Sequence, residues 1–320
     1  MQLPGALAAA LDRILDGASQ EGLRAASARL STRYRAEMRD GSLHLNDETA
    51  GLAYLAARMP ATFAALRAAM ERVAETVPEF SPRSLLDCGA GPGTALWAAE
   101  DCWPGLARAE LWEASAPIRS LGGRLAEAGT VSTVEWRAGD ITRDLSPRVN
   151  ADLVTLSYVL DELEPAARDR LIDRLWGATA GILLVVEPGT PAGWQRILAM
   201  RARLIGQGAE IVAPCPHREP CPIAAPDWCH FAQRVSRSRT HRLTKGAEVP
   251  WEDEKYIYLA AARLPTAAPQ ARIVGPVRAG SGKVALKLCR EDGRLEERLV
   301  TRREGETFRQ ARRADWGDAL

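Results

Sequence analysis

Apolar positions in the first 80 residues recur at the spacing of a helix. Leu7, Leu11, Ile14 and Leu15 share one such stripe, and residues 52–59 and 63–77 repeat the pattern. A repeat of three to four residues is typical of helices that bury one face. The sequence therefore predicts a helical cap over residues 1–80.

From residue 84 onward, short apolar runs alternate with stretches of helical pattern. The runs cover residues 84–87, 109–113, 133–137, 152–160 and 181–187. Strands separated by helix-length connections form parallel sheets, because a crossover must return the chain to the same edge. We therefore expect an α/β domain with a parallel sheet over residues 81–205.

The pattern changes again in residues 206–320. Residues 213–230 are rich in proline and hold three cysteines and two histidines, a composition unsuited to a packed helix or a central strand. Such a segment needs a ligand or metal to order it. Beyond it, the runs 256–264, 272–278, 283–289 and 294–300 predict the strands of a C-terminal β extension.

Composition narrows the class of protein. A chain of 320 residues with 46% hydrophobic content can bury a large core, which excludes disorder as its main state. Lysine and arginine number 42 against 41 acidic residues, so any nucleic-acid site must be local and not the result of net charge. No uncharged apolar run approaches the roughly 20 residues of a membrane span, and we expect no membrane role.

A glycine-rich turn follows the first predicted strand. Asp87 lies near the end of that strand, and Gly89, Gly91 and Gly93 precede a helix that begins near Thr94. Glycine lets the backbone approach a ligand closely, and a helix start offers unpaired amides. A nicotinamide dinucleotide fingerprint would place a glycine where Thr94 stands. The turn instead resembles motif I of the class I S-adenosylmethionine-dependent methyltransferases, whose fold is Rossmann-like.

That resemblance implies a cofactor site at the ends of three strands. Asp87 and the backbone of the three glycines would hold the methionyl part of S-adenosylmethionine. Glu113, which ends the second strand, would bind both ribose hydroxyls, and Asp140 after the third strand would reach the adenine amino group. Either carboxylate alone is better explained as a solvated strand end. Together with the glycine turn they predict the cofactor site.

The catalytic side carries no recognisable signature. The chain has neither Asn/Asp-Pro-Pro-aromatic after the fourth strand nor a cysteine between residues 102 and 215 that would serve as a thiolate nucleophile. Ser157, Tyr158, Asp161 and the turn 187–189 are expected to line the pocket. The sequence assigns a catalytic role to none of them.

Four cysteines form a candidate metal site. Cys215, Cys221 and Cys229 lie within one loop, and Cys289 follows sixty residues later at the end of a predicted strand. Four thiols suit tetrahedral zinc or an iron-sulfur cluster. The spacings of six and eight lack the close cysteine pair common in structural zinc sites, and a cluster accepts looser spacing. Four unrelated reduced thiols are the alternative.

Other side chains near these motifs have different expected roles. His217 or His230 could replace one thiol as a ligand. Cys88 and Cys102 lie next to the glycine turn or on its helix, where core packing is the expected role.

Five blocks of sequence, in order, carry a family resemblance. They are residues 214–222, 227–231, 237–242, 252–256 and 312–318. The chain resembles, over about residues 45–318, the methyltransferase-like assembly-factor family of the small ribosomal subunit, which has mitochondrial members and bacterial homologues. The resemblance implies binding to small-subunit ribosomal RNA during assembly.

The family resemblance also implies a 4Fe-4S cluster, carried by Cys215, Cys221, Cys229 and Cys289, with zinc as the alternative. The resemblance implies that the chain binds S-adenosylmethionine. It does not define an RNA atom that would accept the methyl group. The fold is predicted to start close to Met1 without an Arg-rich leader, and six cysteines are too few for a disulfide scaffold. We therefore expect a cytoplasmic bacterial member, acting as a monomer.

Local charge supports an RNA partner. Residues 201–245 hold eight lysines or arginines against three acidic residues. Arg234, Arg237 and His241 are spaced to share one helical face, where arginine would contact phosphates. A solvated helix face is the alternative.

Three hypotheses follow. The first is a class I methyltransferase-fold protein that binds S-adenosylmethionine and an iron-sulfur cluster and acts on or binds small-subunit ribosomal RNA, with methyl transfer to that RNA as its enzymatic form. The second is a non-catalytic assembly factor that uses the cofactor structurally or as a sensor. The third is a zinc-binding small-molecule methyltransferase.

Overall fold

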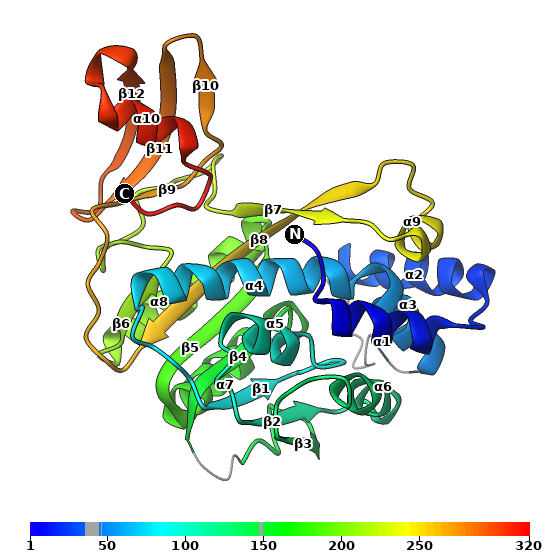
Figure 1. The fold of residues 1–320 in the computed structure, drawn as a ribbon. Coiled ribbons are helices and arrows are strands. Elements are labelled where there is room, and N and C mark those ends of the chain that lie inside the picture. The colour runs from blue at the N-terminus through cyan, green and yellow to red at the C-terminus, as the bar shows by residue number, and fades with distance from the viewer. Residues whose placement is uncertain (36–44, 46, 147–149) are drawn as a thin grey trace.

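The computed structural model describes residues 1–35, 45, 47–146 and 150–320. Within these residues an eight-stranded sheet has the order β3-β2-β1-β4-β5-β8-β6, with β7 paired to β8 (Figure 1). Its strands are β1 (Ser84–Cys88), β2 (Arg108–Glu113), β3 (Thr133–Ala138), β4 (Ala151–Ser157), β5 (Thr179–Pro188), β6 (Glu210–Ala213), β7 (Phe231–Ser236) and β8 (Trp251–Ala262).

The first five strands run parallel, as the sequence predicts. β1 pairs in parallel with both β2 and β4, β2 with β3, and β4 with β5. β8 then lies antiparallel between β5 and β6. The chain order reverses at β1, and open α/β sheets bind ligands at the carboxyl ends of strands on either side of such a reversal.

Helices cover both faces of the sheet. They are α5 (Thr94–Cys102), α6 (Ala116–Ala126), α7 (Pro165–Ala178) and α8 (Pro191–Gly206). Because crossovers between parallel strands are right-handed, the connections toward β3 and those toward β5 lie on opposite faces. The central strands are therefore apolar on both sides, and β5 is buried along most of its length.

The predicted helical cap is present. It consists of α1 (Gly5–Leu15), α2 (Gln20–Arg35), α3 (Glu48–Ala57) and α4 (Met59–Thr76). The Asp47 side chain caps α3 by accepting a hydrogen bond from the Ala50 amide at 2.8 Å. The long helix α4 packs beside α5 and across β7 and β8, so the cap shares the main hydrophobic core (Figure 1). Among the described helices, none is both long and apolar enough to cross a membrane.

The C-terminal region contains a second, antiparallel sheet with its own small core. β9 (Ala271–Ile273), β10 (Arg278–Gly280), β11 (Lys283–Arg290) and β12 (Leu295–Thr301) form it, and α10 (Glu306–Arg313) packs on it. This unit projects from the main sheet in Figure 1. Short helices complete the chain: η1 (Leu160–Glu162), α9 (Arg239–Lys245) and η2 (Arg302–Glu304).

The C-terminal third also contributes to the main sheet. β6, β7 and β8 all come from residues beyond 205, and the sequence predicted only the last of these as a strand. β8 is the common partner, because both β6 and β7 pair with it. The division of the chain into regions at residues 80 and 205 stays a prediction.

Candidate functional site

The glycine turn is built as the motif requires. Gly89, Gly91 and Gly93 all have positive φ, at 67°, 54° and 84°. A Cβ atom on Gly89 would approach Val159 Cγ2 to 2.7 Å, so a larger residue would meet both backbone strain and a close contact. Gly93 ends the turn as the N-cap of α5. The turn therefore passes closely along the carboxyl end of the sheet.

Asp87 lies on β1, two residues before Gly89. Its carboxyl group is buried, and Oδ1 accepts a hydrogen bond from Thr155 Oγ1 on β4 at 2.7 Å. Oδ2 is buried and has no hydrogen-bond partner among the described residues. Burial raises the pKa of Asp87 to about 7, against the hydrogen bond from Thr155. Asp87 thus offers a buried acceptor with unused capacity.

Glu113 meets the glycine turn from β2. Its Oε2 accepts a hydrogen bond from the Gly91 amide at 3.0 Å, and its Oε1 accepts one from the Ser115 amide at 2.8 Å. Burial raises the pKa of Glu113, although these backbone hydrogen bonds lower it. Each carboxylate oxygen keeps a lone pair for a further donor. The structure brings Glu113 and the turn together.

Asp140 lies in a turn after β3. Its Oδ1 accepts hydrogen bonds from the amide and hydroxyl of Thr142, at 2.8 and 2.6 Å, and Arg143 forms an ion pair with Oδ2 at 2.8 Å. Burial would raise the pKa of Asp140, but the hydrogen bonds from Thr142 and the charge of Arg143 lower it. These contacts stay within its own turn, and they tie Asp140 neither to Asp87 nor to Glu113.

A network that the sequence did not indicate lies after β4. Tyr158 has a φ of 57°, and its hydroxyl donates a hydrogen bond to Glu254 Oε1 at 3.0 Å. Arg58 binds both oxygens of Glu254, at 3.0 and 2.7 Å, and its guanidinium lies 5.3 Å from the centre of the Tyr158 ring. A left-handed backbone at a non-glycine residue costs about 1–3 kcal/mol. The network holds Tyr158 in this conformation, and no local sequence signal connects its three members.

The turn after β5 is also held by charged side chains. Glu187 is buried, where its Oε2 pairs with Arg196 Nε at 2.7 Å and its Oε1 accepts the Leu160 amide at 3.0 Å. Burial, with the nearby Asp161 carboxylate, raises the pKa of Glu187 to about 7. Burial and Asp161 likewise raise the pKa of Glu162 to about 8. Through its contacts with Arg196 and Leu160, Glu187 joins α8 to the residues after β4.

A cleft of about 890 Å³ opens between the cap and this edge of the sheet. Asp161 and Pro188 line it, as expected, together with Arg24 from α2 and Lys245 from α9. Ser157 and Tyr158 do not belong to its lining. The cleft is large enough for a nucleotide-sized acceptor.

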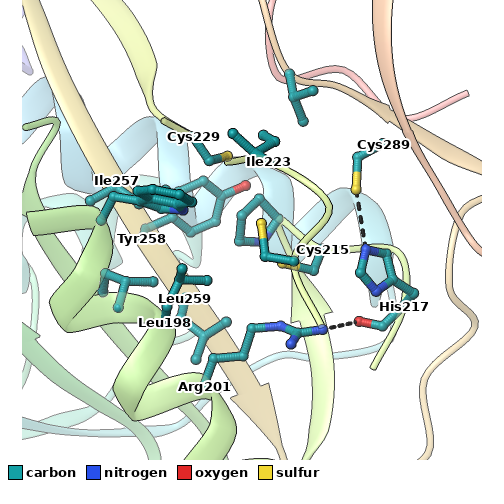
Figure 2. Close-up of a pocket in the computed structure, with 15 residues that line it drawn as sticks. Leu198, Arg201, Cys215, His217, Ile223, Cys229, Ile257, Tyr258, Leu259 and Cys289 are labelled. Carbon is teal, nitrogen blue, oxygen red and sulfur yellow. Dashed lines mark hydrogen bonds between the residues drawn. The ribbon is translucent and has the colours of Figure 1, made fainter. Parts of the chain in front are cut away.

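All four predicted cysteines line one pocket, which we call the thiol site (Figure 2). Cys215 and Cys221 follow β6, Cys229 precedes β7, and Cys289 enters from β11 of the second sheet. The walls are mainly apolar, with side chains of α8 and β8. The structure thus brings Cys289 to the other three thiols.

Burial disfavours the thiolate form of three of these cysteines. Burial raises the pKa of Cys215, Cys229 and Cys289, to about 12 for Cys289, and neighbouring thiols contribute in the same direction. His217 Nε2 lies 3.2 Å from Cys289 Sγ, so one predicted alternative ligand contacts the thiol site. Among the described residues, no group of three His, Cys, Asp or Glu side chains is arranged to hold a metal ion.

The remaining candidate side chains do not join the thiol site. His230 stacks on Trp228 at 4.9 Å between ring centres and is absent from the pocket lining. Cys88 is fully buried in the core, and Cys102 packs partly buried against it. Their surroundings agree with the expected packing role.

The predicted arginine face is wrong. Arg234 lies on β7 and stacks on Trp251, 4.0 Å from its ring centre, while Arg237 lies between β7 and α9. His241 is buried, with Nε2 3.2 Å from Glu252 Oε1. Because residues 231–236 form a strand and Ser238 caps a new helix, helical spacing does not apply across this segment.

Comparison with known proteins places the chain in a ribosomal context. The family model described as "Mitochondrial small ribosomal subunit Rsm22" matches residues 48–320. The human ribosome assembly protein METTL17, mitochondrial, is 32% identical over 85% of this chain and 63% of its own. The Rsm22-cox11 tandem protein 2, mitochondrial, of Schizosaccharomyces pombe is 26% identical over 88% of this chain and 44% of its own. The chain therefore spans under two thirds of the length of these relatives.

Solved structures with a similar fold are methyltransferases of low sequence identity. An O-methyltransferase family protein from Burkholderia thailandensis is 15% identical, covers 73% of this chain and 68% of its own, and has a TM-score of 0.45. The strand order and the reversed β8 are those of the class I methyltransferase fold, as expected.

The expected cytoplasmic location is wrong. The family description and the names of the human and fission-yeast relatives all include the word mitochondrial, which points to the mitochondrion. The physical reason is that an import segment is not part of the folded domain. Sequence motifs within the folded domain therefore do not indicate the compartment in which the protein works.

Proposed function

Because this chain belongs to the Rsm22 family of the mitochondrial small ribosomal subunit, we propose that it is a ribosome assembly protein that acts on or binds small-subunit ribosomal RNA. It uses S-adenosylmethionine at the glycine turn and a 4Fe-4S cluster at the thiol site. The observation that carries this proposal is the family match over residues 48–320. We further propose that it acts as a monomer.

The glycine turn fits S-adenosylmethionine. The unpartnered Oδ2 of Asp87 would accept from the ammonium group of the methionyl part, and the turn leaves room for close backbone approach. Glu113 would bind the ribose hydroxyls with the lone pairs that Gly91 and Ser115 leave unused. Asp140 is assigned to the adenine amino group, and binding there would replace one of the contacts that Thr142 and Arg143 now make with its oxygens. The cofactor supplies an activated methyl group.

The thiol site fits an iron-sulfur cluster by its donor set. Four thiols from two segments, the loop of residues 215–229 and β11, line one pocket with apolar walls, which exclude water from such a centre. Structural zinc usually has a close cysteine pair, and this chain has none among the four. Because metal binding deprotonates the thiols and joins β11 to the loop of residues 215–229, loading would be coupled to folding of the C-terminal region.

Exposed cations around α9 support an RNA partner. Arg239 and Arg242 are exposed on α9. Nearby, Arg234 stacks on Trp251 and pairs with Asp253, and Lys245 pairs with Glu252. Guanidinium groups bind phosphate oxygens in pairs, and aromatic rings accept unstacked bases. Replacing Arg239 and Arg242 together with alanine should weaken binding to small-subunit RNA and reduce the salt dependence of that binding.

A second candidate function is a non-catalytic assembly factor. The residues after β4 and β5, where methyltransferases act on the acceptor, are engaged in internal contacts: Tyr158 with Glu254, and Glu187 with Arg196. These contacts give each side chain a structural role that needs no bound acceptor. In this case S-adenosylmethionine would be structural or would report metabolic state.

Two measurements separate the candidates. Ribosomal RNA methylation is mapped in wild-type cells, in deletion cells and in cells that carry Asp87→Ala. A methyl mark lost in both mutants excludes the non-catalytic function. Crosslinking to RNA with sequencing of the bound site tests the partner: crosslinks outside small-subunit RNA, or none, would exclude the ribosomal function and favour a small-molecule methyltransferase.

A further inference from the structure

Two buried arginines lie beside the thiol site. Arg201 on α8 is 4% exposed and Arg272 on β9 is fully buried. Arg201 donates to the carbonyl of His217 at 2.6 Å, and Arg272 donates to the carbonyls of Pro214 and Gly317, each at 3.0 Å. In the described part of the chain, no carboxylate forms an ion pair with either group. Arg201 Nε and Arg272 Nη2 are buried without any hydrogen-bond partner there.

Both arginines are close in the fold to cysteines of the thiol site. Arg201 lines the pocket with the four cysteines, and Figure 2 shows it below Cys215. Arg272 is the direct cross-strand partner of Cys289 in the pairing of β9 with β11, so their side chains leave the same face of that sheet.

This arrangement leaves two positive charges without a negative partner. A buried cation is strongly unfavourable unless it is paired, and among the described residues these two guanidinium groups donate only to backbone carbonyls. Metal binding replaces the thiol protons and turns the same four side chains into thiolates. An inorganic centre with four thiolates is anionic, and it would then lie beside both guanidinium groups.

We propose that Arg201 and Arg272 are the buried counter-charges of an anionic four-thiolate centre, and that their carbonyl hydrogen bonds hold the turn that carries Cys215. This inference rests on the proposed function of the thiol site. The arginines are positioning residues, because they act on the centre through its ligands. They also favour the more negative, reduced form of a cluster over its oxidised form.

The test compares neutral and charged replacements on the full chain. Arg201→Met and Arg272→Met remove the charge, whereas Arg201→Lys and Arg272→Lys retain it. Arg203→Met is the matched control, because Arg203 lies on the same helix and pairs with Asp173 instead. Each protein is reconstituted anaerobically with iron and sulfide, and its reduction potential is measured by titration with dithionite.

Each methionine variant is expected to lose stabilisation of the reduced form by tenfold or more, which is a fall of about 59 mV for a one-electron couple. The lysine variants and Arg203→Met should keep the wild-type potential. Methionine variants that load fully and keep the wild-type potential would overturn the proposal. If the methionine variants do not fold, folding of the lysine variants supports the counter-charge role, and failure of both sets contradicts it.

The outcome also separates this inference from the proposed function. Stoichiometric zinc and no labile sulfide in the wild-type protein would overturn the iron-sulfur assignment alone. The counter-charge role would then be tested by zinc affinity, which should fall tenfold or more in the methionine variants and not in Arg203→Met. Equal zinc affinities would overturn it.

Discussion

Trp228 donates a hydrogen bond from its indole nitrogen to the backbone carbonyl of Gly189, at 3.0 Å. Trp228 immediately precedes Cys229 of the thiol site, and Gly189 lies in the turn after β5, beside the cleft. The Gly189 amide in turn donates to the carbonyl of Lys255 on β8 at 3.0 Å. The cysteine segment is thus tied directly to the edge of the sheet where the cofactor and acceptor would meet.

Trp228→Phe should lower the free energy of unfolding by about 1 kcal/mol. It removes the hydrogen bond to Gly189 and keeps an aromatic ring against His230. Urea unfolding measures the change, and Trp251→Phe at an exposed position should stay within about 0.5 kcal/mol of wild type. Equal effects of the two substitutions would show that the bond to Gly189 contributes nothing to stability.

Gly89→Ala should reduce both stability and affinity for S-adenosylmethionine more than Gly91→Ala does. Both positions have positive φ, but only at Gly89 does a Cβ meet a neighbour closely, at 2.7 Å from Val159. The shared backbone strain costs on the order of 1 kcal/mol, and the contact adds to it. Thermal unfolding and calorimetric titration measure the two effects.

Gly123→Ala is the control for that pair. Gly123 lies within α6 with open space around its Cα, so alanine should be neutral or stabilising by up to about 1 kcal/mol. A Gly91→Ala protein less stable than Gly89→Ala would contradict the contact argument.

Asp87→Asn should change how stability depends on pH. Because burial raises the pKa of Asp87 to about 7 in the folded state, its contribution is fully present below about pH 4 and is lost as pH rises through about 7. Asparagine does not titrate, so the variant should gain stability relative to wild type as pH rises from 4 to 8. Urea unfolding without ligand at pH 5 and pH 8 measures this difference.

The same substitution should weaken binding of S-adenosylmethionine at pH 8, because the amide carries no charge for the methionyl ammonium group. A stability difference that stays constant between pH 5 and pH 8 would mean that Asp87 does not titrate with a raised pKa.

Cys289→Ala should abolish stoichiometric iron and labile sulfide after anaerobic reconstitution. It removes the only member of the thiol site that comes from β11, and three thiols leave one iron without its protein ligand. Cys102→Ala removes a thiol from the main core and should leave iron and sulfide at wild-type levels. Full iron and sulfide in the Cys289 variant would exclude Cys289 as a ligand.

The sequence predicted those parts of the fold whose signals are local. The first five strands are each marked by a short apolar run, and the turn at Gly89 is marked by residues that tolerate positive φ. β6 and β7 were missed because they have their partner in β8, and a strand that depends on a distant partner carries little signal of its own. The same dependence made the arginine face at Arg234 and His241 a wrong prediction.

The residues of the candidate site also fall into two groups, those with a local sequence signal and those without one. Cysteine, aspartate and glycine have chemistry and backbone preferences that can be read at each position, which is why the sequence could propose the four thiols and Asp87 as site residues. Arg58, Glu254, Arg201 and Arg272 were not, because an arginine or glutamate in sequence is usually a solvated surface residue. Only burial beside particular neighbours gives these four their roles.

By itself, then, the amino-acid order determined which groups were available: a glycine turn, four thiols and the strands that carry them. The tertiary structure alone decided that Cys289 reaches the other three thiols, that Tyr158 is held by Glu254, and that Arg272 faces Cys289 from the neighbouring strand. The physical reason is that charge pairing and burial depend on distance in space, and distances between far-separated residues are set by how the two sheets and the cap pack together.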